Sequence, residues 1–556
     1  MAADRSVKRE PGLARFCGME HFDAVIIGAG VSGMYQLHKL RQLGLSVQVL
    51  EAGTDVGGTW YWNRYPGARF DSESYTYGYS WSEEVLQEWD WKERFSPQPE
   101  NLKYLQFVAD KFDLRSDIRF ETRVKLAHFD DAATKWVVTT EDGYEVSSSF
   151  LVTAIGALSV PVMPRYDGIE DFAGASFHTS NWPKEAIDFT GKRVAVIGTG
   201  ATAVQLIPEM AKTAGELTIF QRTPNWCAPL HNGPIEPDEM ADIKSRYAEI
   251  FETCNSTFAG FEHVPDQRKA VQTSSEDRYE LWEKLWGEPG FGIWMANFRD
   301  VLVNEEANAL LTEFVASKIR ERVNDPALAD KLIPKNHGFG TRRVPMETKY
   351  FEVYNQPNVE LVDLLETPID RVTASGVLTT EADGSQQERS FDYIIYATGF
   401  DAVTGAFDKI DIRGVDDVAL RDIWASGPRT FLGLQITGLP NLFTLVGPNN
   451  ASTFCNMPRC IEQNVEWVTE FISYLRANNY SRAEPTAEAM DQWGDHVITT
   501  GDRMLFSKVN SWFMGVNSNI DGKQERRFLL YAAGFPTYRE KAEEVVQGSY
   551  SGFVLS

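Results

Sequence analysis

A short apolar run that leads directly into a glycine motif occurs twice in this chain, and it restricts the possible folds more than any other feature. The first copy spans residues 22–33 and carries its glycines at Gly28, Gly30 and Gly33. Residues 34–43 continue with helical spacing. Strand, tight turn and helix in this order are typical of a dinucleotide-binding unit, in which the helix N-terminus receives a pyrophosphate.

An acid follows the first motif at the position where such a unit binds ribose. The next apolar run, residues 46–50, ends at Glu51, and a carboxylate about 20 residues past the first glycine accepts hydrogen bonds from ribose hydroxyls. The glycines also have separate tasks. Gly28 permits the turn, Gly30 lets a pyrophosphate approach, and Gly33 lets helix and strand pack closely. The first unit therefore predicts a site for FAD or NAD.

The second copy of the motif differs where the ribose is recognised. It runs from Arg193 to Ala203, and its small residues are Gly198, Gly200 and Ala203. The strand that follows ends at Arg222 and Thr223 instead of an acid. An arginine pairs with a 2′-phosphate that an acid would repel. The second unit therefore predicts a site for NADPH.

Composition excludes several classes of protein. A chain of 556 residues exceeds a single core and predicts roughly two to four domains. The net charge of -25 argues against a nucleic-acid or anionic-membrane partner. No stretch reaches the ~18 uncharged apolar residues of a membrane span, and residues 1–19 lack the apolar run of a signal peptide. These features predict a cytoplasmic protein.

The cysteines and histidines do not indicate a disulfide framework or a metal centre. The five cysteines are Cys17, Cys227, Cys254, Cys455 and Cys460, and no pair has Cys-x-x-Cys spacing. The eight histidines show no spacing typical of zinc or non-haem iron sites. We therefore expect no metal.

A long spaced motif lies between the two units. Residues 172–183 resemble the fingerprint F-x-G-x-x-x-H-x-x-x-W-P of type I Baeyer–Villiger monooxygenases at every specified position, namely Phe172, Gly174, His178, Trp182 and Pro183. From the residues alone, His178 is more often structural than a base. The resemblance implies the same modest role, with His178 acting through hydrogen bonding and positioning at the domain connection.

The resemblance to this family extends from Asp23 to Ser556 and implies further site residues. It implies that Gly58, Thr59 and Trp60 lie along FAD, that Arg342 contacts NADP, and that Trp512 belongs to a mobile loop that senses bound NADP. It implies Arg343 as the active-site arginine, with Asp71 orienting it. It also implies that the substrate pocket includes Ser452, Thr453, Phe454 and Cys455. Many relatives have lysine at the position of Arg342.

Together these features predict an α/β fold with two Rossmann-like dinucleotide-binding domains, for FAD and NADP, and an inserted helical subdomain. The expected boundaries are an N-terminal extension at 1–19, FAD-binding segments at 20–155 and 395–556, NADP-binding segments at 156–227 and 331–394, and a helical subdomain at 228–330. The second FAD-binding segment is expected to carry the substrate pocket and the mobile loop.

The reaction implied by the resemblance is the conversion of a ketone to an ester or lactone by NADPH and molecular oxygen, through a C4a-peroxyflavin. An anion in a dry site needs a cation, and Arg343 supplies one without titrating. Sulfide oxidation is a possible side activity. The alternatives are a flavin-containing N- or S-oxygenating monooxygenase, a disulfide reductase, which would need the missing Cys-x-x-Cys, and a non-catalytic NADPH sensor.

Overall fold

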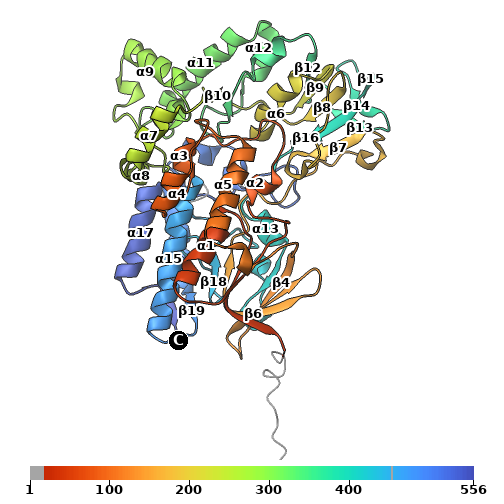
Figure 1. Cartoon of the computed structure of the whole chain (residues 1–556). Coiled ribbons are helices and arrows are strands. Elements are labelled where there is room, and N and C mark those ends of the chain that lie inside the picture. Colours follow the sequence, from red (N-terminus) through yellow and green to blue (C-terminus); the bar gives the residue numbers. More distant parts are fainter. Residues whose placement is uncertain (1–17, 452–454) are drawn as a thin grey trace, which may run out of the picture.

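The first sheet is the central sheet of the larger of the two dinucleotide-binding units. A computed structural model describes residues 18–451 and 455–556 (Figure 1). Eight strands form this sheet in the order β17-β4-β5-β6-β1-β2-β3, with β18 also paired to β6. Their bounds are β1 Glu20–Ile27, β2 Val47–Leu50, β3 Ile118–Arg119, β4 Val124–Asp130, β5 Lys135–Thr140, β6 Glu145–Thr153, β17 Asp411–Arg413 and β18 Leu442–Thr444.

The centre of the first sheet is parallel and fully covered. β1 pairs in parallel with β2 and β6, and Val25 and Ile26 are completely buried, because helices cover both faces of a parallel sheet. α1 packs against α15, and α1, α5 and α15 run beside one another in Figure 1. The helices of this unit are α1 Val31–Gln42, α2 Thr59–Trp62, α3 Ser74–Tyr77, α4 Glu83–Glu88, α5 Gln98–Lys111, α13 Gly405–Asp408, α14 Leu420–Ile423, α15 Met457–Ala477, α16 Ala487–Gly501 and α17 Phe535–Gln547.

The second sheet is wholly parallel and has the order β12-β9-β8-β16-β7. Its strands are β7 Ala175–His178, β8 Arg193–Ile197, β9 Glu216–Gln221, β12 Val359–Asp363 and β16 Tyr393–Tyr396, and α6 Ala201–Ala211 follows β8. The expected boundary between residues 394 and 395 falls inside β16. All four residues of that strand pair with both β7 and β8, so the strand belongs to the second sheet in full.

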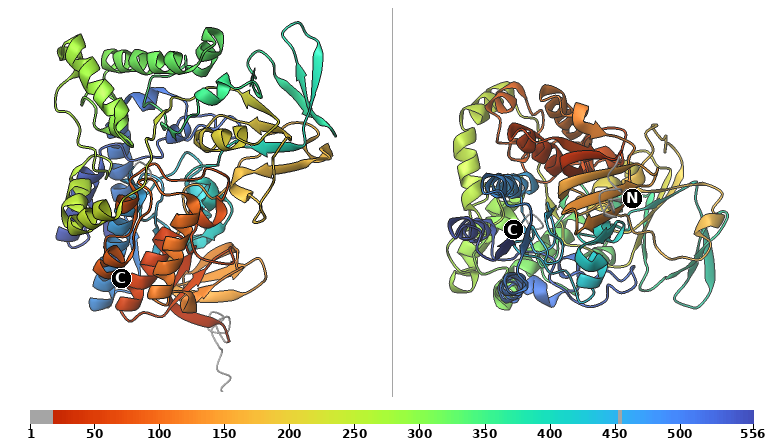
Figure 2. Two further views of the ribbon diagram at one scale, coloured as in Figure 1. Left: turned by 45° about the horizontal axis from the view of Figure 1, so that its top comes forward. Right: turned by 90° about the horizontal axis from the view of Figure 1, so that it is seen from below.

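Smaller elements lie at the edges of both units. A three-stranded antiparallel sheet of β13 Ile369–Val372, β14 Gly376–Thr380 and β15 Gln386–Ser390 projects from the second unit, away from the helical subdomain (Figure 2). The remaining strands form two pairs, β10 Ala228–Pro229 with β11 Met346–Glu347, and β19 Ala483–Pro485 with β20 Phe553–Leu555.

Six helices make up the region expected to be a helical subdomain. They are α7 Pro237–Ser245, α8 Tyr247–Ser256, α9 Ser275–Gly287, α10 Gly292–Met295, α11 Glu305–Arg322 and α12 Pro326–Leu332. α8 contacts α3 and α17 of the first unit, whereas α9 contacts β10 beside the second. The subdomain therefore contacts both units, and its green helices lie at the top left of Figure 1, above the first unit. No helix in the described ranges is long and apolar enough to cross a membrane.

Candidate active site

The turn after β1 forms a cradle made of backbone alone. Gly28 has a φ of +104°, and a Cβ there would lie 2.5 Å from the carbonyl oxygen of Ala154. A Cβ on Gly33 would lie 1.9 Å from the carbonyl oxygen of Gly28. Gly30 and Gly58 also meet, because a Cβ on Gly58 would lie 2.8 Å from the Gly30 Cα. The N-terminus of α1 is therefore free of side chains where a pyrophosphate would approach.

Glu51 lies beside this cradle and is 5% exposed. Its carboxylate accepts hydrogen bonds from the amide nitrogens of Ala29 and Gly53, each at 2.7 Å. Burial raises the pKa of Glu51, although these two donors oppose the shift. The carboxylate thus holds the glycine turn in place, at the end of β2 where the ribose of a bound dinucleotide is expected.

The Gly58-Thr59-Trp60 segment begins α2. Gly58 precedes the helix, Thr59 is exposed and Trp60 is buried. The Trp60 indole nitrogen donates to the Tyr77 hydroxyl at 3.0 Å, and its ring packs edge-on against Phe70. Trp60 is therefore part of the aromatic packing that supports the segment.

The second motif leaves open space at its helix N-terminus. A Cβ on Gly200 would meet no atom within 4 Å, while Ala203 is completely buried where α6 packs on the sheet. A Cβ on Gly198 would lie 2.5 Å from the carbonyl oxygen of Ala397. The N-terminal end of α6 can therefore receive an anion.

Two arginines converge beside this helix. Arg222 directly follows β9, and Arg342 lies in the loop before β11. The pKa of Arg342 is lowered by burial and by the positive charge of Arg222, and its Nε is buried without a hydrogen-bond partner among the described residues. Thr223 lies next to them, where its carbonyl oxygen accepts from the Thr199 hydroxyl at 3.0 Å. Two neighbouring cations, one of which has this unpartnered Nε, favour a phosphate ligand.

Arg343 and Asp71 form an ion pair between the two units. Arg343 Nη1 lies 2.6 Å from Asp71 Oδ2, and the side chains are 32% and 4% exposed. The same carboxylate oxygen accepts from the Met346 amide at 3.2 Å. The Arg343 guanidinium carbon lies 5.7 Å from the centre of the Phe291 ring. A buried acceptor thus holds a cation whose guanidinium remains partly accessible.

Gln205 on α6 is a member of this site that the sequence analysis missed. Its Nε2 donates to Asp71 Oδ1 at 3.3 Å and to the Arg69 carbonyl oxygen at 2.9 Å. Its Oε1 accepts from the Tyr65 hydroxyl at 2.8 Å. A glutamine inside a helix carries no sequence signal for such a role, since the contact joins residues 134 positions apart. Gln205 therefore connects the helix of the second glycine motif to Asp71.

The fingerprint residues lie where β7 joins the second sheet. His178 ends β7, and its Nδ1 accepts from the Ser180 amide at 3.1 Å. Burial lowers the pKa of His178 to about 4, so the ring is neutral near pH 7. Trp182 is buried beside Phe177, while a Cβ on Gly174 would lie 2.6 Å from the Phe172 ring. Pro183 follows Trp182 and is partly buried. The fingerprint residues therefore pack against one another around the end of β7.

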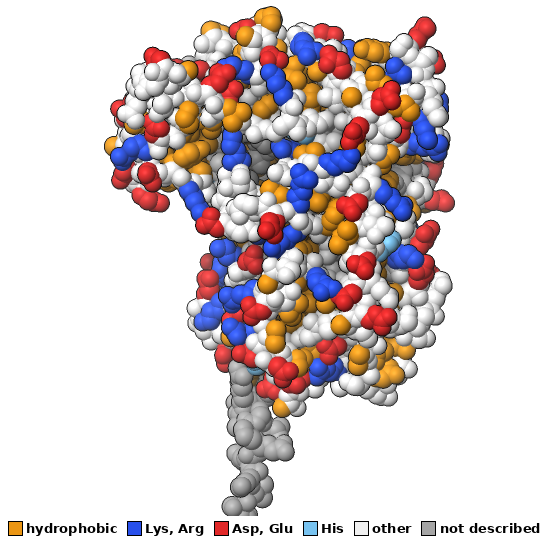
Figure 3. All heavy atoms as spheres, turned by 180° about the vertical axis from the view of Figure 1, so that it is seen from behind, with side chains coloured by type: hydrophobic (Ala, Val, Ile, Leu, Met, Phe, Trp, Pro, Cys, Tyr) orange, Lys and Arg blue, Asp and Glu red, His pale blue; other side chains and the backbone are white. Residues whose placement is uncertain are grey.

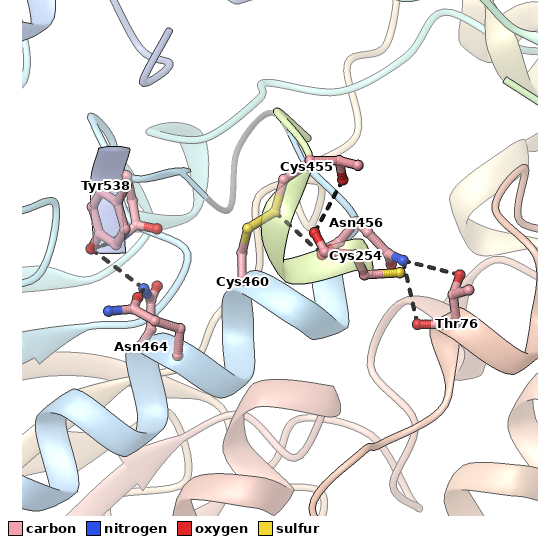
Figure 4. The surroundings of a disulfide bond; sticks show 10 residues. Thr76, Cys254, Cys455, Asn456, Cys460, Asn464 and Tyr538 are labelled. Carbon is pink, nitrogen blue, oxygen red and sulfur yellow. Dashed lines mark hydrogen bonds between the residues drawn. A yellow bond between two sulfur atoms is a disulfide. The ribbon is translucent and has the colours of Figure 1, made fainter. Parts of the chain in front are cut away.

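The expected substrate segment is described only at its end. Ser452, Thr453 and Phe454 lie outside the described residues. Cys455 is paired with Cys460 as a disulfide, which the sequence analysis did not expect (Figure 4). The first turn of α15 separates the two cysteines and leaves their Cα atoms 6.7 Å apart, a span that a disulfide can bridge. Cys227 and Cys254 are free and buried.

Asn456 fixes the same segment from the other side. Its amide nitrogen atom Nδ2 donates to the Thr76 hydroxyl at 3.1 Å and the Thr76 carbonyl oxygen at 3.3 Å (Figure 4). Its backbone amide donates to the Ala259 carbonyl oxygen at 2.7 Å. The start of α15 is therefore bound both to the first unit and to the helical subdomain.

The loop that carries Trp512 contacts both units. Asn519 accepts from Arg222 at 2.9 Å, and Asp521 lies 2.7 Å from Arg165. Lys523 pairs with Asp401. Trp512 is partly buried and lines a cavity of about 230 Å³ between this loop and residues 401–428. This cavity is separate from the Arg343–Asp71 pair, since neither residue lines it.

The structure thus brings many of the predicted residues into three groups. They are the cradle at α1, the N-terminal end of α6 with Arg222 and Arg342, and the Arg343–Asp71 pair. In the described part of the chain, no group of three or more His, Cys, Asp or Glu side chains is arranged to hold a metal. On the face shown in Figure 3, basic and acidic side chains are interspersed.

Comparison with known proteins shows that the chain is similar to flavin-binding oxygenases. The family model of flavin-binding monooxygenase-like proteins matches residues 23–251. A 2-oxo-Δ(3)-4,5,5-trimethylcyclopentenylacetyl-CoA monooxygenase of Pseudomonas putida is 49% identical over 540 residues, which cover 96% of this chain and 98% of that protein. An acetone monooxygenase (methyl acetate-forming) of Gordonia sp. (strain TY-5) is 44% identical, with 96% and 99% covered.

Solved structures of similar proteins are also found. The crystal structure of the OTEMO complex with FAD and NADP superimposes with a TM-score of 0.92 at 49% identity, over 96% of this chain and 99% of that one. A phenazine N-monooxygenase of Lysobacter antibioticus is 40% identical, with 96% and 97% of the two chains covered. Proteins at this level of similarity therefore include one named for oxygenation at nitrogen.

Proposed function

Because the chain belongs to the Baeyer–Villiger monooxygenases, we propose how its own residues serve the oxidation of a ketone. The enzyme depends on FAD and NADPH and converts ketones to esters or lactones with molecular oxygen. The single observation that supports the proposed active site best is the 2.6 Å contact between Arg343 and Asp71. It joins the two dinucleotide-binding units where their cofactors would meet.

The two glycine motifs would hold the cofactors. Gly28, Gly30, Gly33 and Glu51 fit FAD, because bare backbone amides face the open end of the cradle. Gly200 and the pair of Arg222 and Arg342 fit NADPH, because two neighbouring cations, one with an unpartnered Nε among the described residues, accompany an open helix N-terminus. When bound, FAD supplies the oxygen chemistry and NADPH supplies the hydride.

Arg343 would hold a positive charge where negative charge develops during oxygen transfer. An arginine guanidinium is a planar, delocalised cation, and a preorganised cation in a site shielded from water stabilises a developing anion strongly. Asp71 would orient the guanidinium through its 2.6 Å contact, with Met346 and Gln205 holding the carboxylate in turn. His178 would position the domain connection without carrying a proton.

Product identification separates this function from N-oxygenation. We expect NADPH-dependent oxygen uptake with a panel of cyclic and linear ketones, and mass spectrometry of the products should show esters or lactones. Tertiary amines and sulfides serve as the comparison substrates. Formation of N-oxides, with no ester from any ketone of the panel, would assign the chain to the N-oxygenating branch instead.

Replacing Arg222 should weaken the preference for NADPH. In Arg222→Ala, the ratio of kcat/KM for NADPH to that for NADH should fall about ten- to hundredfold, because a charge-assisted contact contributes roughly 1.5–3 kcal/mol. Steady-state kinetics with both coenzymes measure the ratio. Arg165→Ala is the matched control, since Arg165 is an exposed arginine that contacts the same loop through Asp521. An equal ratio in Arg222→Ala and the parent enzyme would remove Arg222 from the phosphate site.

We also propose that the domain division follows the expected boundaries except at β16, with the second FAD-binding segment beginning after Tyr396. The support for this placement is the pairing of β16 with β7 and β8. The helical subdomain would then lie between the two NADP-binding segments and close one side of the active site.

A further inference from the structure

A buried group of acid and imidazole side chains lies behind Arg343 and has no part in the function proposed above. Glu73 precedes α3, two residues after Asp71, and its side chain is 7% exposed. His263 lies in the loop after α8, with Nε2 3.1 Å from Glu73 Oε1. The other Glu73 oxygen, Oε2, is buried without a hydrogen-bond partner in the described ranges. A buried carboxyl–imidazole pair in such a place needs an explanation.

This pair directly supports the turn that carries Phe291. The backbone amide of Phe291 lies 3.2 Å from His263 Nε2 and donates to it. A Cβ added to Gly290 would lie 2.7 Å from Glu73 Oε1, so the turn rests against the carboxylate. The Phe291 ring is 5% exposed and lies beneath the guanidinium of Arg343, 5.7 Å from its carbon.

The segment from Asp71 to Glu73 therefore fixes Arg343 in two ways. Asp71 binds the guanidinium edge directly, while Glu73 and His263 hold the aromatic ring under its face. A guanidinium over an aromatic face is attracted by the ring, and the strength of this attraction depends on where the ring lies. We propose that Glu73 and His263 are positioning residues that set Phe291, and through it the guanidinium of Arg343, for the oxygenation step. This inference rests on the role proposed for Arg343.

Protonation of His263 distinguishes positioning from simple packing. Nε2 carries at most one hydrogen, so it either donates to Glu73 or accepts from the Phe291 amide. Burial lowers the pKa of His263, but the negative charges of Glu73, Glu262 and Glu288 outweigh it and raise the pKa above its usual value. Glu262 is in turn hydrogen-bonded by Tyr75 and faces Arg246. When the proton is lost from Nε2, that atom no longer donates to Glu73 and instead accepts from the Phe291 amide.

The linkage has a defined sign. Because the folded pKa of His263 is raised, the stability from the charged pair is complete below the unfolded value of about 6.5 and is lost as pH rises through the folded value. The kcat for ester formation should change over the same interval above pH ~6.5, since the Phe291 turn changes its partner there.

Two substitutions at His263 test the proposal. His263→Phe keeps a ring but removes both contacts, and kcat for ester formation should fall about three- to thirtyfold, with KM for the ketone and bound FAD nearly unchanged. His263→Gln keeps a hydrogen-bonding group near Nε2 and should recover most of kcat. The ratio of parent to His263→Gln kcat should change with pH, and so should the difference in their melting temperatures. Glu73→Gln should remove the same pH dependence.

The controls separate this proposal from the one on which it rests. His496→Gln replaces another part-buried histidine, which contacts the Tyr531 hydroxyl at 2.9 Å, and its ratio to the parent should stay flat with pH. The parent enzyme and Arg343→Ala are assayed with the same ketone. If the parent forms no ester, the proposed function fails. The positioning proposal alone is overturned if the parent forms ester, Arg343→Ala does not, and the His263 variants keep the kcat of the parent. It is also overturned if the ratio of parent kcat to His263→Gln kcat stays flat with pH.

Discussion

Arg343→Ala should nearly abolish ester formation while the protein still binds FAD. Removal of a preorganised charge aimed at a developing anion costs about 3–4 kcal/mol, or several hundredfold in rate. Bleaching of the flavin by NADPH under anaerobic conditions should survive at least in part, because hydride transfer depends mainly on how the nicotinamide lies. Stopped-flow absorbance measures this half-reaction, and product analysis after mixing with oxygen and ketone measures the other.

Asp71 provides an internal comparison for this experiment. Asp71→Ala should give a milder form of the same defect, because the carboxylate orients the guanidinium of Arg343 but does not supply the positive charge. Arg371→Ala is the control, since its guanidinium is 50% exposed and pairs with Asp171 on the surface. Ester formation by Arg343→Ala at nearly the parent rate would end the assignment, and Arg342 would become the candidate cation.

Arg459→Met should be the most destabilising single substitution that we consider. Arg459 and Glu462 form an ion pair of 3.1 Å on α15, with side chains 2% and 8% exposed. The Arg459 guanidinium carbon also lies 4.4 Å from the centre of the Phe251 ring on α8. Removing one partner of a buried pair leaves an unpaired charge and costs about 3–5 kcal/mol. Denaturant unfolding of the FAD-loaded protein, followed by flavin fluorescence, measures the change.

Two further variants decide what causes the loss. Arg459→Met combined with Glu462→Leu removes both charges and should be more stable than Arg459→Met alone, although Glu462 also accepts from the Ser80 amide at 2.7 Å. Lys541→Met breaks an exposed pair of the same i,i+3 spacing on α17 and should change stability by less than about 1 kcal/mol. If the double variant were no better than the single one, packing against Phe251 would account for the loss.

The parts of the fold that depend on local sequence could be predicted. Both glycine motifs are local, because Gly28 and Gly198 each need a turn conformation that adjoining residues define. The two-unit α/β architecture followed from these motifs and is shown by the comparisons. Arg343 and Asp71, in contrast, were chosen through resemblance to a family. Their contact joins residues 272 positions apart, and no spacing rule in a single sequence reveals such a pair.

Other features had no signal in the sequence at all. Gln205 and His263 act through contacts that form only when separate segments fold together. The Cys455–Cys460 disulfide was missed because a spacing without Cys-x-x-Cys, in a chain with an odd number of cysteines, does not favour any pairing. The boundary expected between residues 394 and 395 falls inside β16, because the sequence of an apolar strand does not show which sheet the strand joins.

The surroundings of Asp71 determine how this enzyme can be recombined with its relatives. Three groups that hold its carboxylate, Gln205, Arg343 and Met346, come from the second dinucleotide-binding unit. A hybrid that takes this unit from another family member inherits all three groups from the donor, while Asp71 stays with the recipient. Such chimeras should retain oxygenation only where the donor supplies an amide, a guanidinium and a backbone N–H at those places. At these contacts with Asp71, the two units must therefore change together.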